Sequence, residues 1–446
     1  MKAKRYLLLF MLCLLFTIGS LAKNSVAPMT AGYVFLKLNE TDVTAAIKLT
    51  NWGDTQVNNI TYNLYYMENG LNEGPLTMTF DTPLADGEVR EVQIPIKPGE
   101  KLGKADVLFN ITEVNGRCNE ASVGYTYITC CTVNKMPFKR VLVEDYTAMW
   151  CWNCPKGMVA TDALVRMFPD DVVAVSIHKA DDISKVVSYS VYEGLMKMYA
   201  TALPSVWIAR DTKAAGCDAT SVYQIEKSRV TYMNIDVKAQ WDETGDNIRV
   251  TTEVEPCMTP EEGNTYAVGY VLTASGLTNS EWFQESSYSE YSSSDYDDAP
   301  EEMRFYADAA NYLEGYSMVK GVVYNHVAIE SKGMLNGLEN SLTGDFDANE
   351  TKIHTTTFDD ISRYSVIDDR SKIEVVAVLF NTKTNKIENA ARCYIGDGND
   401  SPTEVKQING QDNTGSTQIF DMQGRKVSGK PMPGLYIVNG RKVVIK

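Results

Sequence analysis

The sequence predicts a multidomain protein of mixed α/β and β class. One α/β domain is expected between two β-sandwich domains, and a short β-unit ends the chain. A length of 446 residues is about right for three domains. Near residue 150, an apolar strand, a Cys-x-x-Cys turn and a segment with helical spacing follow one another. Segments of alternating apolar and polar residues, separated by turn residues, stand on both sides of this unit.

Residues 1–22 have the features of a secretory signal peptide. Three cations precede a short apolar run at residues 6–16, and Ala22 ends a small-residue cleavage site. The apolar run is short for a membrane span, and no later stretch is apolar enough to be one. We therefore expect an exported protein of the periplasm, outer membrane or cell surface, with no membrane-spanning segment.

The charge of the chain excludes some classes of partner. Its net charge is −16, and removal of the cationic leader makes the remainder more acidic. Such a protein is a poor candidate for binding nucleic acid or anionic membrane surfaces. There are three histidines, and none is spaced with cysteines as a zinc ligand set. No metal and no cofactor is predicted.

Residues 28–136 are predicted to form an immunoglobulin-like β-sandwich. Val43, Ala45 and Ile47 alternate with polar residues, as expected of a strand with one buried face. Turn signals such as Asn115-Gly116 separate several such strands. We find no catalytic constellation in this part of the sequence.

Residues 137–231 are predicted to form the α/β domain. The order strand, helix, strand, helix, strand follows from the periodicity of its apolar residues. The expected elements are a strand at 141–146, a helix after Cys154, a strand at 172–178, a helical stretch at 183–199, a strand from 206 and a helix at 219–230.

Cys151 and Cys154 stand where the first strand turns into the first helix. The first helical turn has unpaired backbone N–H groups, and the positive end of the helix dipole lies there. Both favour the thiolate form of Cys151, which is the form that attacks disulfides. The motif therefore predicts redox chemistry between sulfur atoms.

The same stretch resembles the thioredoxin superfamily. Trp150 directly precedes the first cysteine, and the acid Asp145 lies six residues before it. Leu203-Pro204 opens a later apolar strand, as the cis-proline of that superfamily does. The resemblance implies a thioredoxin-like fold for residues 137–231, in which Trp150 packs the site.

The resemblance also implies a role for each residue of the motif. Cys151 would be the attacking thiolate and Cys154 the resolving thiol. Asp145, buried beneath the pair, would accept the proton of Cys154. Leu203 and Pro204 would present backbone to a bound substrate, with a cis peptide bond between them.

His178 ends the predicted strand at 172–178. Ligands of open α/β sheets gather at the carboxyl ends of strands, so His178 is a possible neighbour of the cysteine pair that tunes its titration. The alternative is a polar strand-end residue without a role.

Residues 232–397 are predicted to form a second β-sandwich. Within it, the acidic, Ser- and Tyr-rich stretch at 285–302 is expected to be a long loop, either functional or mobile and solvated. Together with the motif, Ile177-His178 and Tyr324-Asn325-His326-Val327 resemble the outer-membrane-protein-28-related family of thioredoxin-like exported proteins. That resemblance covers roughly residues 137–395 and implies an outer-membrane-associated or surface protein.

The end of the chain is predicted to be a linker at 398–415 and a β tail at 416–446. Asn439-Gly440 between apolar runs is a strong hairpin signal. The stretches 420–427 and 434–437 resemble the C-terminal sorting domain of type IX secretion substrates. Whether the tail is cleaved or retained stays open.

Six further cysteines remain outside the leader and the motif. They allow 15 pairings, among which the sequence does not choose, and buried free thiols are the alternative. Cys130 and Cys131 are adjacent on a probable strand, so only one of them is expected to reach Cys118. The six are Cys118, Cys130, Cys131, Cys217, Cys257 and Cys393.

Two functions are weighed on these grounds. The first is an exported thiol–disulfide oxidoreductase that acts on protein thiols or disulfides through the Cys-Trp-Asn-Cys motif, as reductase, oxidase or isomerase. The second is an outer-membrane-associated or surface binding protein, adhesin-like, in which the α/β domain is a scaffold and the cysteine pair a structural clip. Its partners would be cell-surface or outer-membrane components. The joint presence of both cysteines, Asp145, Trp150 and Pro204 favours the first.

Overall fold

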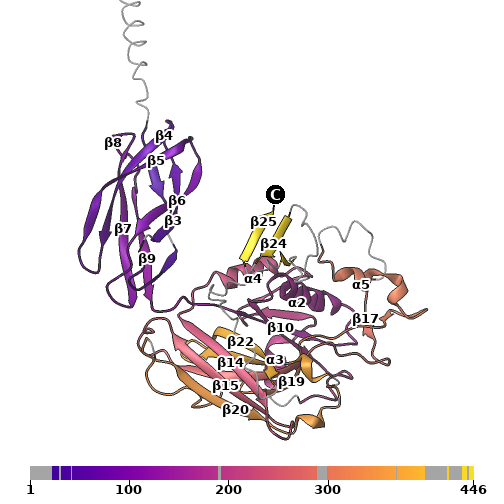
Figure 1. Cartoon of the computed structure of the whole chain (residues 1–446). Coiled ribbons are helices and arrows are strands. Elements are labelled where there is room, and N and C mark those ends of the chain that lie inside the picture. The colour runs from indigo at the N-terminus through magenta and orange to yellow at the C-terminus, as the bar shows by residue number, and fades with distance from the viewer. Residues whose placement is uncertain are drawn as a thin grey trace, which may run out of the picture. The chain divides into compact units, whose positions relative to one another are not determined.

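The structure is a computed structural model of the whole chain, and Figure 1 shows its course. It forms two compact units, residues 1–395 and residues 396–446. The predicted signal peptide and linker lie outside the described residues. Those described are 23–29, 32–41, 43–188, 192–288, 299–348, 350–367, 369–396, 419–420, 434–438 and 441–445.

The N-terminal part of the first unit consists of two β-sheets around one core. One sheet has the order β1-β3-β6, and the other has the order β2-β9-β7-β4-β5, with β8 paired to β7. Residues of both sheets alternate between this core and solvent, which is the pattern of a β-sandwich. The strands are β1 (Val26–Pro28), β2 (Tyr33–Lys37), β3 (Val43–Asn51), β4 (Val57–Tyr66), β5 (Asn72–Leu84), β6 (Val89–Ile96), β7 (Gly103–Val114), β8 (Arg117–Cys118) and β9 (Tyr125–Val133).

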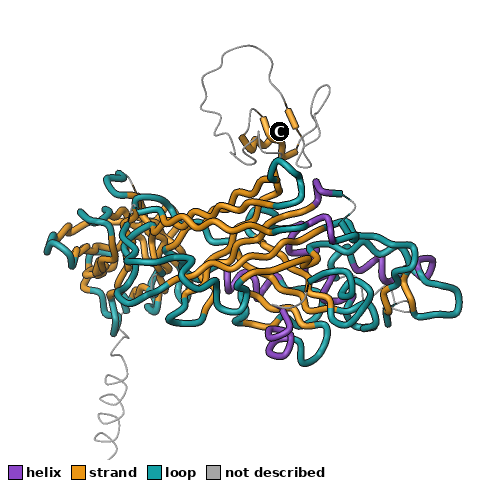
Figure 2. The backbone as a smooth tube through the Cα atoms, turned by 90° about the horizontal axis from the view of Figure 1, so that it is seen from below, coloured by secondary structure: helices purple, strands orange, loops and turns teal. Residues whose placement is uncertain are grey.

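The rest of the first unit is built on a single 11-stranded sheet, whose strands run side by side in Figure 2. Its order is β13-β12-β10-β11-β19-β16-β21-β22-β14-β15-β20. The strands are β10 (Val141–Thr147), β11 (Val172–His178), β12 (Ser205–Ile208), β13 (Thr212–Lys213), β14 (Met233–Trp241), β15 (Ile248–Pro256), β16 (Tyr266–Ala274), β19 (Val327–Lys332), β20 (Lys352–Phe358), β21 (Ile373–Asn381) and β22 (Lys386–Gly396).

This sheet differs from the predicted arrangement of an α/β domain followed by a separate sandwich. The strands from 137–231 form one end of this sheet, and those from 232–397 continue it, because β19 and β16 follow directly after β11. The β-rich, multidomain class is confirmed. The segment after residue 231 extends the central sheet instead of forming two layers of its own.

Helices cover both faces of the sheet around β10. Val141 and Val143 face a core shared with α2 and α4, whereas Leu142 and Tyr146 face a core shared with α3. Because successive side chains of a strand point to opposite faces, every residue of β10 is buried. The helices are α2 (Pro155–Met167), α3 (Tyr192–Tyr199), α4 (Thr220–Lys227), α5 (Met303–Ala307) and the 3-10 helices η2 (Ala309–Asn311), η3 (Ile361–Arg363) and η4 (Arg370–Lys372).

Two of these helices are shorter than predicted. In the stretch expected to be helical at 183–199, residues 183–187 form turns and bends, and α3 spans Tyr192–Tyr199. The helix expected at 219–230 spans Thr220–Lys227.

The second unit contains a three-stranded antiparallel sheet. It has the order β23-β24-β25, and Val438 pairs with Arg441 across the predicted Asn-Gly turn. Its strands are β23 (Ile419–Phe420), β24 (Gly434–Val438) and β25 (Arg441–Ile445).

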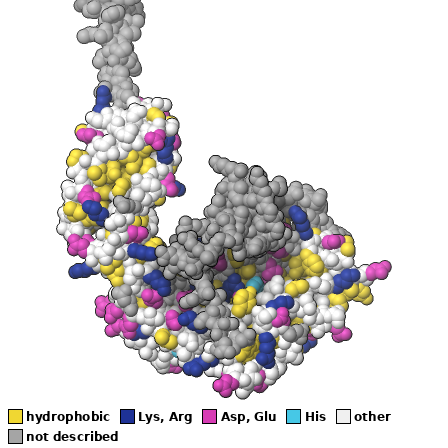
Figure 3. All heavy atoms as spheres, viewed as in Figure 1, with side chains coloured by type: hydrophobic (Ala, Val, Ile, Leu, Met, Phe, Trp, Pro, Cys, Tyr) yellow, Lys and Arg dark blue, Asp and Glu magenta, His cyan; other side chains and the backbone are white. Residues whose placement is uncertain are grey.

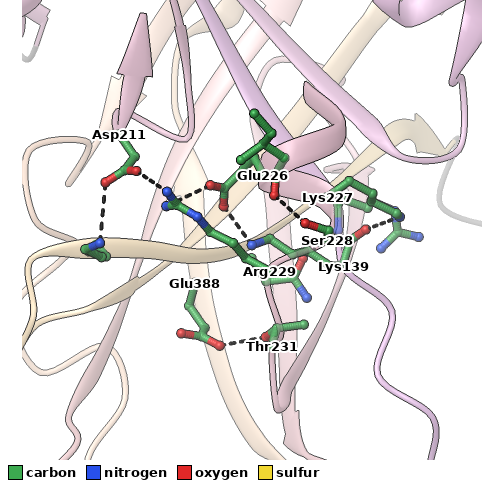
Figure 4. Close-up of polar contacts among 12 residues, drawn as sticks. Lys139, Asp211, Glu226, Lys227, Ser228, Arg229, Thr231 and Glu388 are labelled. Carbon is green, nitrogen blue, oxygen red and sulfur yellow. Dashed lines mark hydrogen bonds and ion pairs between the residues drawn. The ribbon is translucent and has the colours of Figure 1, made fainter. Parts of the chain in front are cut away.

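Ion pairs anchor the segment that follows α4 (Figure 4). Arg229 pairs with Asp211 at 2.6 Å and with Glu226 at 3.0 Å, and Glu226 pairs with Lys139 at 2.7 Å. Two of these charges are largely shielded from water, since Lys139 and Glu226 have side chains only 10% and 7% exposed. The network ties the end of α4 to the chain that enters β10.

Elsewhere on the face seen in Figure 3, acidic and basic side chains are interspersed.

Asn389 in β22 joins three segments of the sheet. Its buried amide donates hydrogen bonds to the carbonyls of Phe138 (2.9 Å) and Met233 (2.8 Å). Its carbonyl oxygen accepts from the backbone N–H groups of Arg140 (2.8 Å) and Ala390 (2.9 Å). The side chain thereby fixes the start of β10 and the start of β14 against β22.

We predict that Asn389→Ala lowers the free energy of unfolding by about 2 to 4 kcal/mol, because it leaves several buried backbone groups without partners. Urea unfolding followed by tryptophan fluorescence measures this. The exposed Asn58 of β4 is a matched control, and Asn58→Ala should change the value by less than about 0.5 kcal/mol. Equal effects of the two substitutions would contradict the stabilising role of the Asn389 hydrogen bonds.

Candidate functional site

The turn between β10 and α2 places the two cysteines. The N–H of Cys151 donates to the carbonyl of Ala148 at 3.1 Å, and the N–H of Cys154 donates to the carbonyl of Cys151 at 3.0 Å. Cys154 is the N-cap of α2, and Pro155 occupies the first helical position, where a missing N–H costs no helical hydrogen bond. Both sulfur atoms therefore belong to one tight turn at the start of the helix.

The two thiols differ in access to solvent. Cys151 is 7% exposed and Cys154 is fully buried. Cys151 opens onto a pocket of about 520 Å³ that has apolar walls and one charge of each sign at Lys179 and Glu285. The pocket is lined by Trp150, Cys151, Trp152, Lys179, Ala200, Thr201, Ala202, Leu203 and Glu285.

The thiols also differ in acidity. The pKa of Cys151 is lowered to about 7, chiefly by a hydrogen bond from the Cys154 thiol and further by the backbone N–H groups of Asn153 and Cys154, against the opposing effect of burial. The pKa of Cys154 is raised by burial, by its hydrogen bond to Cys151 and by the nearby charge of Asp145. Near neutral pH the thiolate is therefore on Cys151.

Asp145 lies beneath this turn in the middle of the sheet. It pairs with Ser176 of β11 on one side and with Val206 of β12 on the other, and its side chain is fully buried. Neither carboxyl oxygen has a hydrogen-bond partner among the described residues. Burial raises the pKa of Asp145 well above its usual range, and the nearby Asp162 and Cys151 raise it further.

The first turn of α2 presses directly on Asp145 and Pro204. A Cβ atom added to Gly157 would lie 2.7 Å from Asp145 Oδ1 and 2.9 Å from Pro204 Cβ. The Leu203–Pro204 peptide bond is cis, which confirms that expectation. Leu203 packs against the cluster of Ala148, Cys151 and Cys154. The structure thus brings Asp145, Leu203 and Pro204 to the cysteine pair.

Trp150 and His178 support the turn from a second side. The indole N–H of Trp150 donates to the carbonyls of Lys179 (3.0 Å) and Ala180 (3.1 Å) while its ring stays half-exposed. Nδ1 of the buried His178 lies 2.7 Å from Asp181 Oδ2, and the same oxygen accepts from the N–H of Met149 at 3.0 Å. His178 is therefore connected to the motif through Asp181.

One contact segment was missed by the sequence reasoning. Residues 284–288, called the strap below, hydrogen-bond to the motif from 133 or more positions along the chain. They include β17 (Gln284–Glu285), which pairs with β18 (Met318–Val319). Their contacts to the turn run largely through its backbone carbonyls, which carry no sequence signal. The only hint was that the predicted long loop begins at residue 285.

A second cavity, of about 380 Å³, lies beside Arg210 and Arg229. Its charges are engaged within the protein, since Arg210 binds the buried Glu144 through two hydrogen bonds of 2.6 and 2.7 Å and Arg229 is held in the network of Figure 4. We therefore place the candidate site at the cysteine turn.

Two kinds of feature are absent from the described part of the chain. No cluster of three or more His, Cys, Asp or Glu side chains suited to a metal ion occurs there. No helix within it is both long and apolar enough to cross a membrane. All eight cysteines in the described ranges are free thiols, including Cys118, which is exposed.

Comparisons with known proteins give partial likenesses only. No protein-family model matches the chain, and no curated protein matches it. HBP35 of Porphyromonas gingivalis is 15% identical, with a TM-score of 0.42 over 70% of this chain and 98% of that one. A protein from Agrobacterium tumefaciens is 15% identical, with a TM-score of 0.32 over 60% of this chain and 99% of that one. A domain of the outer membrane lipoprotein Omp28 from Porphyromonas gingivalis is 14% identical, with a TM-score of 0.18 over 38% of this chain and 92% of that one. At these values the likenesses assign neither a family nor an activity to this chain.

The contact at Gly157 yields a prediction about stability. Gly157→Ala should lower the free energy of unfolding by about 1 to 3 kcal/mol, because the added methyl group overpacks the site. Gly194 of α3 is the matched control, since nothing lies within 4 Å of its added Cβ. There the better helix propensity of alanine should raise stability by about 0.5 to 1 kcal/mol. Chemical denaturation measures both values, and a stabilising Gly157→Ala would contradict the close contact.

Proposed function

We propose that this protein is an exported thiol–disulfide oxidoreductase and that residues 137–231 are a thioredoxin-like domain within the larger sheet. One observation carries the proposal. An acidic thiol, Cys151, faces a pocket, while a shielded thiol of high pKa, Cys154, stands behind it in hydrogen-bonding contact. A structural clip has no need of this asymmetry, whereas a nucleophile and its resolving partner do.

The first step of the proposed reaction is a disulfide exchange. The Cys151 thiolate attacks one sulfur of a substrate disulfide, so that a bond forms between Cys151 Sγ and that sulfur. The substrate S–S bond breaks, and the second substrate sulfur leaves as a thiolate. The backbone N–H groups of Asn153 and Cys154 stabilise the attacking sulfur before the step.

The second step releases the substrate. Cys154 loses its proton and attacks Cys151 Sγ, which forms the Cys151–Cys154 disulfide, breaks the bond between Cys151 and the first substrate sulfur, and releases that sulfur as a thiolate. Asp145 is the proposed proton acceptor. Its pKa is raised, and is therefore closer to the pKa of a thiol than the pKa of an ordinary carboxyl group is. In total the substrate gains two electrons and the cysteine pair loses them. A thiol reductant closes the cycle, and the reverse sequence oxidises a substrate dithiol.

The proposed substrates are protein thiols or disulfides, without a cofactor. The pocket at Cys151 accepts part of a polypeptide, and Trp150, Leu203 and Pro204 are the proposed contact residues. The proposed location is the periplasm, the outer membrane or the cell surface.

The proposal is tested by the pH dependence of alkylation. In the reduced protein, the rate of iodoacetamide labelling at Cys151 should rise through a midpoint near pH 7, because only the thiolate reacts and its pKa is about 7. Cys154 should remain unlabelled under the same limiting conditions. Since Cys118 is exposed, labelling is read for each cysteine separately by peptide mass spectrometry. Preferential labelling of Cys154, or a folded protein that does not reduce insulin disulfides, would refute the proposal.

The role of Asp145 is tested by Asp145→Asn. The variant should slow resolution of a mixed disulfide at Cys151 several-fold, because the amide cannot take the proton. Its folded state should be more stable at pH 7, since a carboxyl whose folded pKa is raised loses stability as pH rises above its unfolded pKa of about 3.9. This gain should shrink as pH falls towards 4. Stopped-flow kinetics and denaturation at several pH values measure the two effects, and unchanged resolution would remove Asp145 from the mechanism.

A further inference from the structure

The strap, residues 284–288, forms hydrogen bonds to four backbone carbonyls of the cysteine turn. Nε2 of Gln284 lies 3.2 Å from the carbonyl oxygen of Ala148 and 3.1 Å from that of Cys151. It also lies 3.0 Å from the carbonyl oxygen of Glu285 within the strap. The N–H of Glu285 donates to the carbonyl of Met149 at 2.8 Å, and the N–H of Ser287 donates to that of Trp152 at 3.1 Å.

The strap is itself fixed from behind. Gln284 and Ser286 are buried, and Gln284 pairs with Val319 of β18. The N–H of Ser286 donates to the carbonyl of Ser317 at 2.9 Å, and its hydroxyl accepts from Tyr312 at 2.7 Å. The amide of Gln284 is therefore presented to the turn by a rigid support.

The two motif carbonyls bound by Gln284 are the ones that shape the turn. The carbonyl of Ala148 also accepts the N–H of Cys151, and the carbonyl of Cys151 also accepts the N–H of Cys154. The backbone N–H groups of Asn153 and Cys154, which lower the pKa of Cys151, belong to the same turn. An amide that binds both carbonyls thus keeps the donors of the thiolate in place before the reaction begins.

We propose that Gln284 is a positioning residue that holds the turn in the form that stabilises the Cys151 thiolate. This proposal rests on the proposed function and deepens it. It means that a residue from the segment after residue 231 helps to determine how much of Cys151 is thiolate. Gln284 does not touch the substrate in this scheme and acts only through the turn.

Gln284→Met tests this inference, because methionine has nearly the length of glutamine but no donor for the two carbonyls. The midpoint of the alkylation rate of Cys151 should move to higher pH. The rate at pH 7 should fall about two-fold to five-fold, as expected for the loss of one or two hydrogen bonds. Near pH 10, where the thiolate is complete in both proteins, the rates should converge. A merely structural defect would lower the rate at every pH.

The matched control is Gln240→Met, at an exposed position of β14, which should leave the titration unchanged. Circular dichroism establishes that each variant is folded. If Gln284→Met does not fold, Gln284→Asn, which keeps the amide but shortens its reach, should move the midpoint in the same direction by a smaller amount. A folded Gln284 variant with an unchanged midpoint overturns this inference. If that variant still reduces insulin disulfides, the proposed function stands while the positioning role falls.

Discussion

The close packing of α2 on Asp145 and Pro204 is the constraint on which the site depends. Only glycine fits at position 157. Because glycine has no Cβ atom, the start of α2 lies directly against the sheet. This approach excludes water from Asp145 and Cys154, whereas Cys151, one turn earlier, remains at the pocket. The burial of Cys154 and the access of Cys151 to the pocket both follow from the packing of α2 at Gly157. Burial raises the pKa of the Cys154 thiol, and the hydrogen bond from that thiol lowers the pKa of Cys151.

Such a site is costly to the fold. A carboxyl group without hydrogen-bond partners in the interior opposes folding, and a neutral residue of similar shape would be tolerated more easily. The surrounding sheet offsets this cost with a large apolar core that extends from β14 to β22. The buried pair of Glu144 and Arg210, one residue away along β10, shows the usual treatment of a buried charge. Asp145 has no such partner among the described residues, which supports the proton-acceptor role proposed for it.

Local patterns predicted the order of elements around the cysteines, because β10, the turn and α2 are determined by neighbouring residues. The cis bond at Pro204 and the burial of Asp145 followed from the superfamily resemblance. The single sheet was not predictable from periodicity. Every residue of β16 and of β21 is buried. Such continuous apolar runs indicate burial but do not determine which strand lies beside them. The strap escaped prediction for a related reason, since its contacts depend on chain segments far apart in sequence.

The sheet also explains why the segment after residue 231 matters to the site. Leu142, Tyr146 and Val173 of the first strands share a core with Val271 of β16 and Val376 of β21. Beside them, β11 pairs with β19 through Ser176 and Val327, and Ser176 is also the residue that opposes Asp145 of β10. The cysteine turn is thus bounded by Pro204 on one side and by the strap on the other. Its geometry belongs to residues 137–395 together, so the chemistry proposed for the cysteine pair is a property of the combined sheet and not of the α/β segment alone.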